Sequence, residues 1–333
     1  MNRLRFGHVL ATILALASAA SAGAAHTHWA IQAVDADGAG NHPDVGSTNK
    51  VVLEGVVLNN PEDMLDGAAG AHPFMGGQWQ VFVQGEGADH AGTALWMGQN
   101  YGKVSGNHPE DSYTESEWQA EMLRLNYINR VGETGAGHAL VMGDRVRVTG
   151  YAMFRPGYGK TNINERHNKD AFWDFSVEWL GSNVGALPAE AITLADLQAD
   201  AGAEGYDANF PMFDASRLTG SEYYQGTLVR IQEVRFDGGD WGKDQTLTLT
   251  DGTYSLPCRL GISDDFLMPN LLDNEAGFDV IGIFDQESGN KDGYRIWVMG
   301  YDGGTDTLGI VPEPSTLLLL LPAAAAMPRR RRS

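Results

Sequence analysis

The clearest strand in the sequence is the segment from Gly143 to Gly150, which reads Gly-Asp-Arg-Val-Arg-Val-Thr-Gly. Its valines and arginines alternate, as expected for a strand with one face in a core and the other in solvent. The glycines that bracket it allow the backbone to bend at both ends. Residues 151–154 continue the apolar pattern, so we expect one strand over 143–154.

Further strands are predicted on both sides of this segment. Gly55 lies inside the first of them and indicates a bend or bulge. The last has Trp173, Phe175, Val177 and Trp179 on one face. These strands are expected over residues 50–58, 78–83, 92–97, 160–165 and 172–180.

A helix is predicted between the third strand and the strand at Gly143. Apolar side chains fall at helical spacing over residues 116–130. Thr114 and Glu117 have the spacing of a capping box, in which each residue bonds the other's backbone N–H. We therefore expect a helical insertion at 116–130.

The second half of the chain repeats this order of elements. Asp251 and Gly252 predict a tight hairpin between its second and third strands. The repeat is one of order rather than of identical residues. Strands at 224–231, 245–250, 254–260, 277–284 and 294–299 correspond to those at 51–58, 78–83, 92–97, 143–154 and 172–180.

These patterns predict a mainly β protein with two tandem five-stranded Greek-key barrels. They resemble the tandem OB-like domains attached to secreted bacterial nucleases, which implies an OB-like fold for each half. We expect no phosphodiesterase domain like that of those proteins, because the predicted elements leave no stretch to hold one. We expect the first barrel over 25–181, a linker rich in Ala, Gly and Asp over 182–219, and the second barrel over 220–304.

The N-terminal residues 1–24 are typical of a secretory signal peptide. Arg3 and Arg5 precede an apolar core at 9–17, and small residues at 20–24 suit cleavage. The sequence therefore predicts export.

The C-terminal residues 311–333 carry a second targeting pattern. Pro322 interrupts an apolar run of 11 residues at 317–327, and a stable spanning helix needs roughly 20. Arginines after such a run stay cytoplasmic, because carrying them across is costly. The polar and basic parts of the pattern are Val311, Pro312, Glu313, Pro314, Arg329, Arg330, Arg331 and Arg332.

This pattern resembles the PEP-CTERM sorting signal of exported Gram-negative proteins. The resemblance implies recognition by an exosortase-type membrane enzyme after passage through the export machinery. It also implies removal of the tail and delivery to the cell surface or extracellular matrix. It covers the tail and says nothing of the folded body.

The amino-acid composition limits the kinds of partner that the folded part of the chain can bind. The formal net charge is −20, and loss of both basic termini would make the body more acidic still. Such a body repels phosphate backbones, which disfavours nucleic acid unless a local basic face exists. Cys258 is the single cysteine, so no intramolecular disulfide is possible. Its apolar context favours a small buried side chain over a nucleophile.

Aromatic side chains near the expected ligand face suggest binding. OB barrels bind ligands across strands 2 and 3, where aromatic rings can stack on sugars or bases. The alternative, which we favour for any single one of these residues, is that the aromatic side chains belong to the barrel core. The candidates are Trp79, Trp96, Tyr101, Trp241 and Tyr254.

Two polar clusters offer other chemistry. Asp285, Glu287, Asn290 and Asp292 could supply oxygen ligands to calcium in a turn, or form a plain acidic hairpin. The segment 162–167 could form a hydrolase site if Asn162, Glu165 and His167 converged in a deep pocket, or a hydrogen-bonded corner of the barrel.

No nucleophile elbow, Walker loop or dinucleotide fingerprint occurs in the sequence. We therefore expect an exported, non-enzymatic protein of the cell surface or matrix that binds polysaccharide. The alternatives are an accessory module for extracellular nucleic acid and a hydrolase with an unrecognised site.

Overall fold

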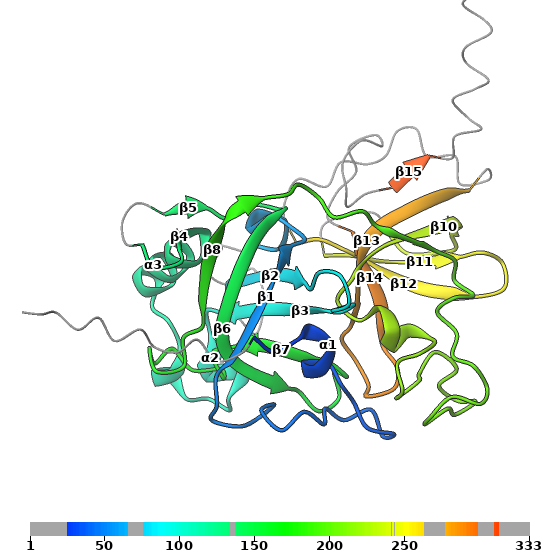
Figure 1. The fold of residues 1–333 in the computed structure, drawn as a ribbon, viewed down its shortest axis with the longest axis horizontal. Coiled ribbons are helices and arrows are strands. Elements are labelled where there is room, and N and C mark those ends of the chain that lie inside the picture. Colours follow the sequence, from blue (N-terminus) through cyan, green and yellow to red (C-terminus); the bar gives the residue numbers. More distant parts are fainter. Residues whose placement is uncertain are drawn as a thin grey trace, which may run out of the picture.

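The computed structural model describes residues 25–65, 76–133, 137–240, 242, 244–262 and 277–298, and the backbone of 310–312 (Figure 1). The predicted signal peptide, Trp241 and the tail after Pro312 lie outside the described residues. The chain is mainly β and forms two closed five-stranded barrels, which confirms the predicted fold class.

The first barrel has the strand connectivity of an OB fold. Its strands follow the order β1-β2-β3-β7-β6, and a β1–β6 pairing closes the barrel. Only β3 and β7 run parallel, and the other neighbours are antiparallel. The strands are β1 (Val51–Val57), β2 (Gln78–Gln84), β3 (Gly92–Gly98), β6 (Asp144–Phe154) and β7 (Thr161–Asn164).

The second barrel repeats this connectivity. Its order is β10-β11-β12-β14-β13, a β10–β13 pairing closes it, and β12 and β14 are its parallel pair. The hairpin at Asp251 and Gly252 joins β11 to β12 as predicted. The strands are β10 (Leu228–Phe236), β11 (Thr246–Thr250), β12 (Ser255–Leu260), β13 (Phe278–Gln286) and β14 (Tyr294–Val298).

One strand correspondence in the repeat was wrong. The strand predicted over 172–180 appears as β8 (Ser176–Asn183), and it lies outside the barrel. β6 has 11 residues, so its first half can pair with β8 while its second half pairs with β7. The strand that matches β14 is therefore β7.

Helix α3 (Glu115–Asn126) lies between the third and fourth barrel strands. Thr114 and Glu117 form the predicted capping box, and Trp118 and Leu125 are buried in the first core. The helix ends earlier than predicted, because β4 (Tyr127–Arg130) pairs with β5 (His138–Ala139) and β8. None of the helices in the described ranges has the length and apolarity needed to cross a bilayer.

The remaining described elements are short. The segment predicted as a linker contributes β9 (Glu190–Ile192), which pairs in parallel with β10, and its Leu194 and Leu197 enter the second core. These residues belong to the second barrel rather than to a linker. The other elements are α1 (His28–Ile31), α2 (Tyr101–Val104), β15 (Ile310–Pro312) on the edge of β13, and 3-10 turns at Pro61–Met64, Pro109–Asp111 and Ser221–Tyr224.

The two barrels pack directly against each other, as Figure 1 shows. A separate apolar cluster joins them, with Phe82 and Ala94 from the first barrel and Ile283 and Trp297 from the second among its members. The backbones approach closely beside this cluster. The amide of Gly92 donates a 2.9 Å hydrogen bond to the carbonyl oxygen of Gln225.

Gly92 permits this approach because it lacks a side chain. A Cβ atom at Gly92 would lie 2.0 Å from the carbonyl oxygen of Gly226, which is well inside van der Waals contact. The Gly92→Ala variant should therefore lose about 2 kcal/mol of stability through overpacking between the barrels, measured by urea unfolding. Gly202→Ala is the control, since a Cβ there meets nothing within 4 Å. Equal stability of the two variants would contradict this packing.

Candidate functional site

The outer face of β2, β3 and β7 is the usual ligand face of an OB barrel. Part of this face packs against the second barrel, and part of it remains open. Inward side chains of these strands, such as Val81, Leu95 and Ile163, fill the first core. Of the outward side chains, Phe82 and Ala94 pack on the second barrel. The rest of this face stays open and forms one wall of a cleft.

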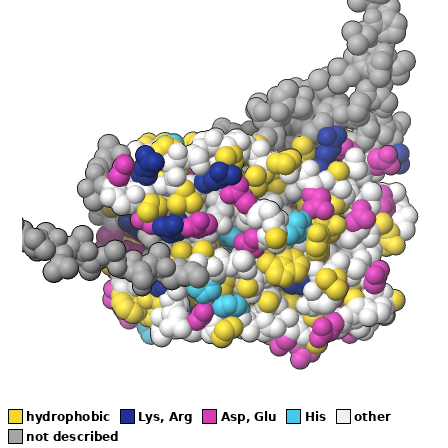
Figure 2. Space-filling model, viewed as in Figure 1, with side chains coloured by type: hydrophobic (Ala, Val, Ile, Leu, Met, Phe, Trp, Pro, Cys, Tyr) yellow, Lys and Arg dark blue, Asp and Glu magenta, His cyan; other side chains and the backbone are white. Residues whose placement is uncertain are grey.

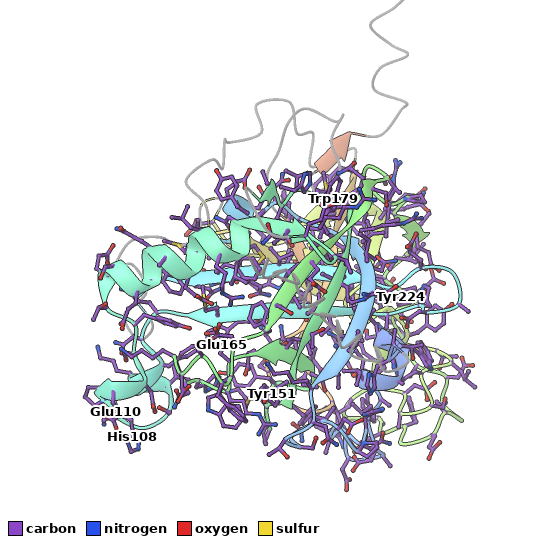
Figure 3. All side chains as sticks on the ribbon, turned by 60° about the vertical axis from the view of Figure 1, so that its left-hand side comes forward. His108, Glu110, Tyr151, Glu165, Trp179 and Tyr224 are labelled. Carbon is purple, nitrogen blue, oxygen red and sulfur yellow. The ribbon has the colours of Figure 1, made fainter. Side chains whose placement is uncertain are left out.

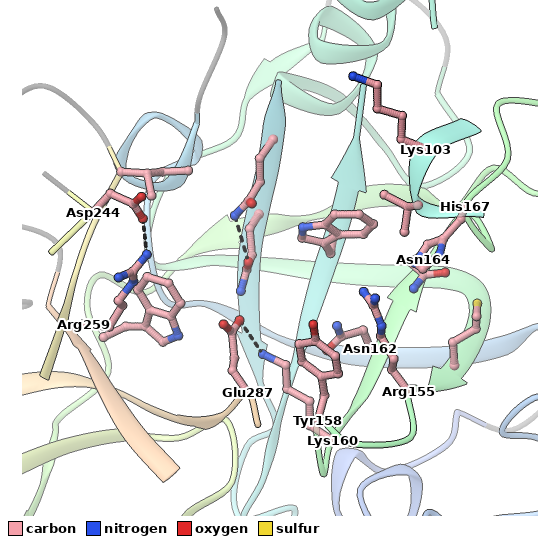
Figure 4. A pocket seen from close by; sticks show the side chains of 17 residues that line it. Lys103, Arg155, Tyr158, Lys160, Asn162, Asn164, His167, Asp244, Arg259 and Glu287 are labelled. Atoms are coloured by element: carbon pink, nitrogen blue, oxygen red, sulfur yellow. Dashed lines mark hydrogen bonds and ion pairs between the residues drawn. The ribbon is translucent and has the colours of Figure 1, made fainter. Parts of the chain in front are cut away.

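The cleft has a volume of about 510 Å³ and lies between the two barrels (Figure 4). Its opposite wall comes from the second barrel, which contributes Arg259 of β12 and Trp297 of β14. The loop between β6 and β7 and helix α2 border it. Other lining residues are Gln78, Gln80, Trp96, Lys103, Val104, Met153, Arg155, Tyr158, Lys160, Asn162, Asn164, His167, Asp244, Ile262 and Glu287.

Four carboxamides give the first-barrel wall its polar character. They alternate with core residues along the strands: Gln78 and Gln80 on β2, and Asn162 and Asn164 on β7. The Oδ1 atom of Asn162 is buried and has no hydrogen-bond partner in the described part of the protein. A carboxamide both donates and accepts hydrogen bonds, so this wall can bind hydroxyl groups.

Trp96 lies among these carboxamides and supplies an aromatic surface. It is half-buried, and its ring packs edge-on against Tyr101 at 5.7 Å and against His167 at 5.5 Å between ring centroids. Burial, together with the nearby charge of Arg155, lowers the pKa of His167 to about 4. His167 is therefore neutral at neutral pH.

The unpaired charge of the cleft is positive. Its two carboxylates are neutralised, since Asp244 pairs with Arg259 and Glu287 pairs with Lys160 at 3.1 Å. Lys103 and Arg155 form no ion pair with any described residue. Acidic side chains are spread over the face shown in Figure 2, and the chain carries −20 overall. The cleft therefore favours an anionic group, although the protein as a whole carries a net negative charge.

Of the predicted stacking residues, Trp96 is the one that lines the cleft. Trp79 and Tyr101 are completely buried in the first core, so they cannot stack on a ligand, and that expectation is corrected. Trp79 also donates a 2.7 Å hydrogen bond to Asn126. Tyr254 is exposed beside the β11–β12 hairpin, away from the cleft residues, and Trp241 lies outside the described residues.

The predicted calcium ligands do not form a metal site. Asp285 is buried and accepts hydrogen bonds from Lys160 at 2.5 Å, Trp297 at 3.0 Å and Gln225 at 3.1 Å. The Lys160 ammonium lies where a cation between Asp285 and Glu287 would bind. Asn290 and Asp292 bond instead to the backbone amides of Gly157 and Gly293. This prediction was wrong because a lysine from the other barrel neutralises the carboxylates.

The predicted cluster of Asn162, Glu165 and His167 separates into two places. Asn162 and His167 line the cleft, whereas Glu165 is buried elsewhere and accepts a 2.5 Å hydrogen bond from the Tyr113 hydroxyl. The three side chains therefore do not converge in one pocket.

Other cleft residues were missed from the sequence. The alternation of Gln78 and Gln80 with Trp79 and Val81 was a usable signal, because it marks the glutamines as the outward positions of a strand. No local pattern places Arg259 and Trp297 opposite them, since that depends on how the barrels pack.

Comparison with known proteins assigns no function. No protein-family model matches the chain, and no curated protein matches its sequence. OB barrels bind both oligosaccharides and oligonucleotides, so the fold alone does not choose between these ligands. The choice between an oligosaccharide and an oligonucleotide therefore rests on the side chains that line the cleft.

Lys160 should be essential to the joint between the barrels. The Lys160→Met variant leaves Asp285 buried without its cation, which should cost about 3–5 kcal/mol in urea unfolding. Adding Asp285→Asn should recover part of this loss. Lys169→Met is the control, because its pair with Glu117 is partly exposed and should cost under about 1 kcal/mol. Similar losses for the two lysine variants would contradict the assigned role.

Proposed function

We propose that the protein is an exported, non-catalytic binding protein whose cleft holds a short segment of an acidic polysaccharide. The observation that carries this proposal is the combination, on the walls of one cleft, of carboxamides, the aromatic ring of Trp96 and two cations that form no ion pair with any described residue. The cleft volume of about 510 Å³ suits a short oligosaccharide, since small-molecule sites span roughly 300–1,000 Å³.

Each group of residues suits a part of such a ligand. The four carboxamides can bind sugar hydroxyls, because they present donors and acceptors side by side. Trp96 offers an apolar ring surface against which a sugar ring can pack. Arg155 and Lys103 are free to bind a carboxylate, and Arg155 can do so with two parallel hydrogen bonds.

Binding is favoured over hydrolysis. Glycoside hydrolysis uses two carboxyl groups that flank the scissile bond. Both carboxylates of the cleft, Asp244 and Glu287, are held in ion pairs with Arg259 and Lys160. These pairings leave them poorly suited to act as acid and base.

Single-stranded nucleic acid is the second candidate ligand. The position of Trp96 on the OB ligand face, next to two unpaired cations, would also suit stacked bases and phosphates. The formal net charge of −20 opposes it, because an acidic protein repels a phosphate backbone.

The destination of the protein is part of the same proposal. The signal-peptide pattern at 1–24 and the tail at 311–333 support export and processing by an exosortase-type enzyme. A polysaccharide ligand suits the cell surface or extracellular matrix to which this route would lead.

Binding can be tested by calorimetry with a short oligogalacturonide. We expect Trp96→Ala to weaken binding about tenfold, because losing an aromatic contact costs about 1.4 kcal/mol. Arg155→Ala should weaken binding and reduce its dependence on salt. Tyr254→Ala should leave binding unchanged, since that exposed ring lies outside the cleft.

A parallel titration with single-stranded DNA distinguishes the two ligands. Tighter, strongly salt-dependent binding of the DNA would overturn the polysaccharide proposal in favour of nucleic acid. Oligogalacturonide binding that Trp96→Ala leaves intact would overturn the assignment of the cleft.

A further inference from the structure

Three carboxylates from distant parts of the chain meet beside the first barrel, away from the cleft. Glu121 lies on α3, Glu165 directly follows β7, and Asp174 precedes β8. One oxygen atom from each lies within 4.8 Å of the others. Figure 3 shows Glu165 below helix α3 on this side of the barrel.

Several oxygen atoms of this cluster have no hydrogen bond. Glu165 uses Oε2 to accept from Tyr113, while its buried Oε1 has no hydrogen-bond partner in the described chain. Glu121 accepts from Arg124 through Oε1 alone. Among the described residues, the carboxylate of Asp174 takes part in neither a hydrogen bond nor an ion pair. The cluster thus keeps free oxygens from all three side chains.

A buried hydroxyl beside the cluster is also unsatisfied. Tyr101 is completely buried, and its hydroxyl has no hydrogen-bond partner in the described part of the chain. Its ring packs against that of Tyr113, the residue whose hydroxyl bonds Glu165, with 5.9 Å between the ring centroids. Buried polar atoms without partners are costly, so two of them at one place indicate an absent bonding partner.

The charge of the cluster is not balanced. Arg124 is the one cation among the described residues that forms ion pairs with it, and its contact with Glu165 is long, at 3.5 Å. The nearby Lys50 ammonium bonds the backbone carbonyl oxygen of Asp174 rather than its carboxylate. Three acidic side chains therefore share one guanidinium.

We propose that Glu121, Glu165 and Asp174 bind a calcium ion. Carboxylate oxygens are the ligands that hard divalent cations prefer. Calcium tolerates irregular geometry and takes six to eight oxygens, so water would complete its shell. Glu121 and Asp174 are only partly buried, which leaves a path for the ion from solvent.

Calcium bound here would stabilise the fold rather than act in the cleft. It would tie helix α3 to the end of β7 and to the segment that leads into β8, and β4, β5 and β6 separate the first of these parts from the second along the chain. Its effect should therefore appear in the stability of the protein, independently of polysaccharide binding.

The proposal can be tested on the mature chain after chelation and at pH 8. Calorimetry with calcium chloride should show one site per chain, and calcium should raise the melting temperature by several degrees. Terbium should bind at the same site and luminesce on excitation of tyrosine, because the Tyr113 hydroxyl lies 2.5 Å from Glu165.

Glu121→Gln and Asp174→Asn should each weaken calcium binding tenfold or more. Asp174→Asn should remain at least as stable as the wild type without calcium, since it removes a like charge from the cluster and breaks no ion pair among the described residues. Glu115→Gln, on the exposed part of the same helix, is the matched control and should bind normally.

Absence of calcium binding by the wild type would overturn the proposal. Binding that persists unchanged in Glu121→Gln and Asp174→Asn would also overturn it, because the ion would then lie elsewhere. A preference for magnesium over calcium would overturn the choice of ion.

Discussion

The buried ion pair between Lys160 and Asp285 is the interaction on which the arrangement of the two barrels depends. Lys160 directly precedes β7 of the first barrel, and Asp285 lies on β13 of the second. Asp285 also accepts hydrogen bonds from Gln225 and from Trp297, which forms part of the opposite cleft wall. The buried carboxylate of Asp285 thus holds the two barrels together and also fixes the position of the Trp297 ring in the cleft wall.

The alternation of side chains along β2, β3 and β7 explains how one face serves two purposes. Its apolar outward residues, Phe82 and Ala94, are covered by the second barrel. Its carboxamides and Trp96 stay open to the cleft. Packing the second barrel over part of the ligand face of the first forms a site with two walls.

Much of the fold could be predicted from local patterns. The alternation at 143–150 and the capping box at Thr114 can be recognised from residues that are close together in the sequence. The repeat of element order follows from comparing such local patterns along the chain. The predicted closing strand was wrong because an 11-residue strand can hold two partners along one edge. The predicted strand is the more apolar of the two, so apolarity alone does not reveal which strand closes the barrel.

The site was less predictable, for physical reasons. Trp79 and Trp96 look alike in sequence, and only the phase of each strand relative to the core separates them. Asp285 and Glu287 resembled calcium ligands because their cation, Lys160, lies 125 residues away along the chain from Asp285. The carboxylates of Glu121, Glu165 and Asp174 likewise meet only in the folded protein.

The most direct test of ligand binding between the barrels is a crystal structure of the mature chain with a bound oligogalacturonide. We expect the sugar to lie in the cleft against Trp96, with a carboxylate in contact with Arg155 or Lys103. An oligosaccharide bound elsewhere on the protein, with the cleft empty, would contradict this assignment.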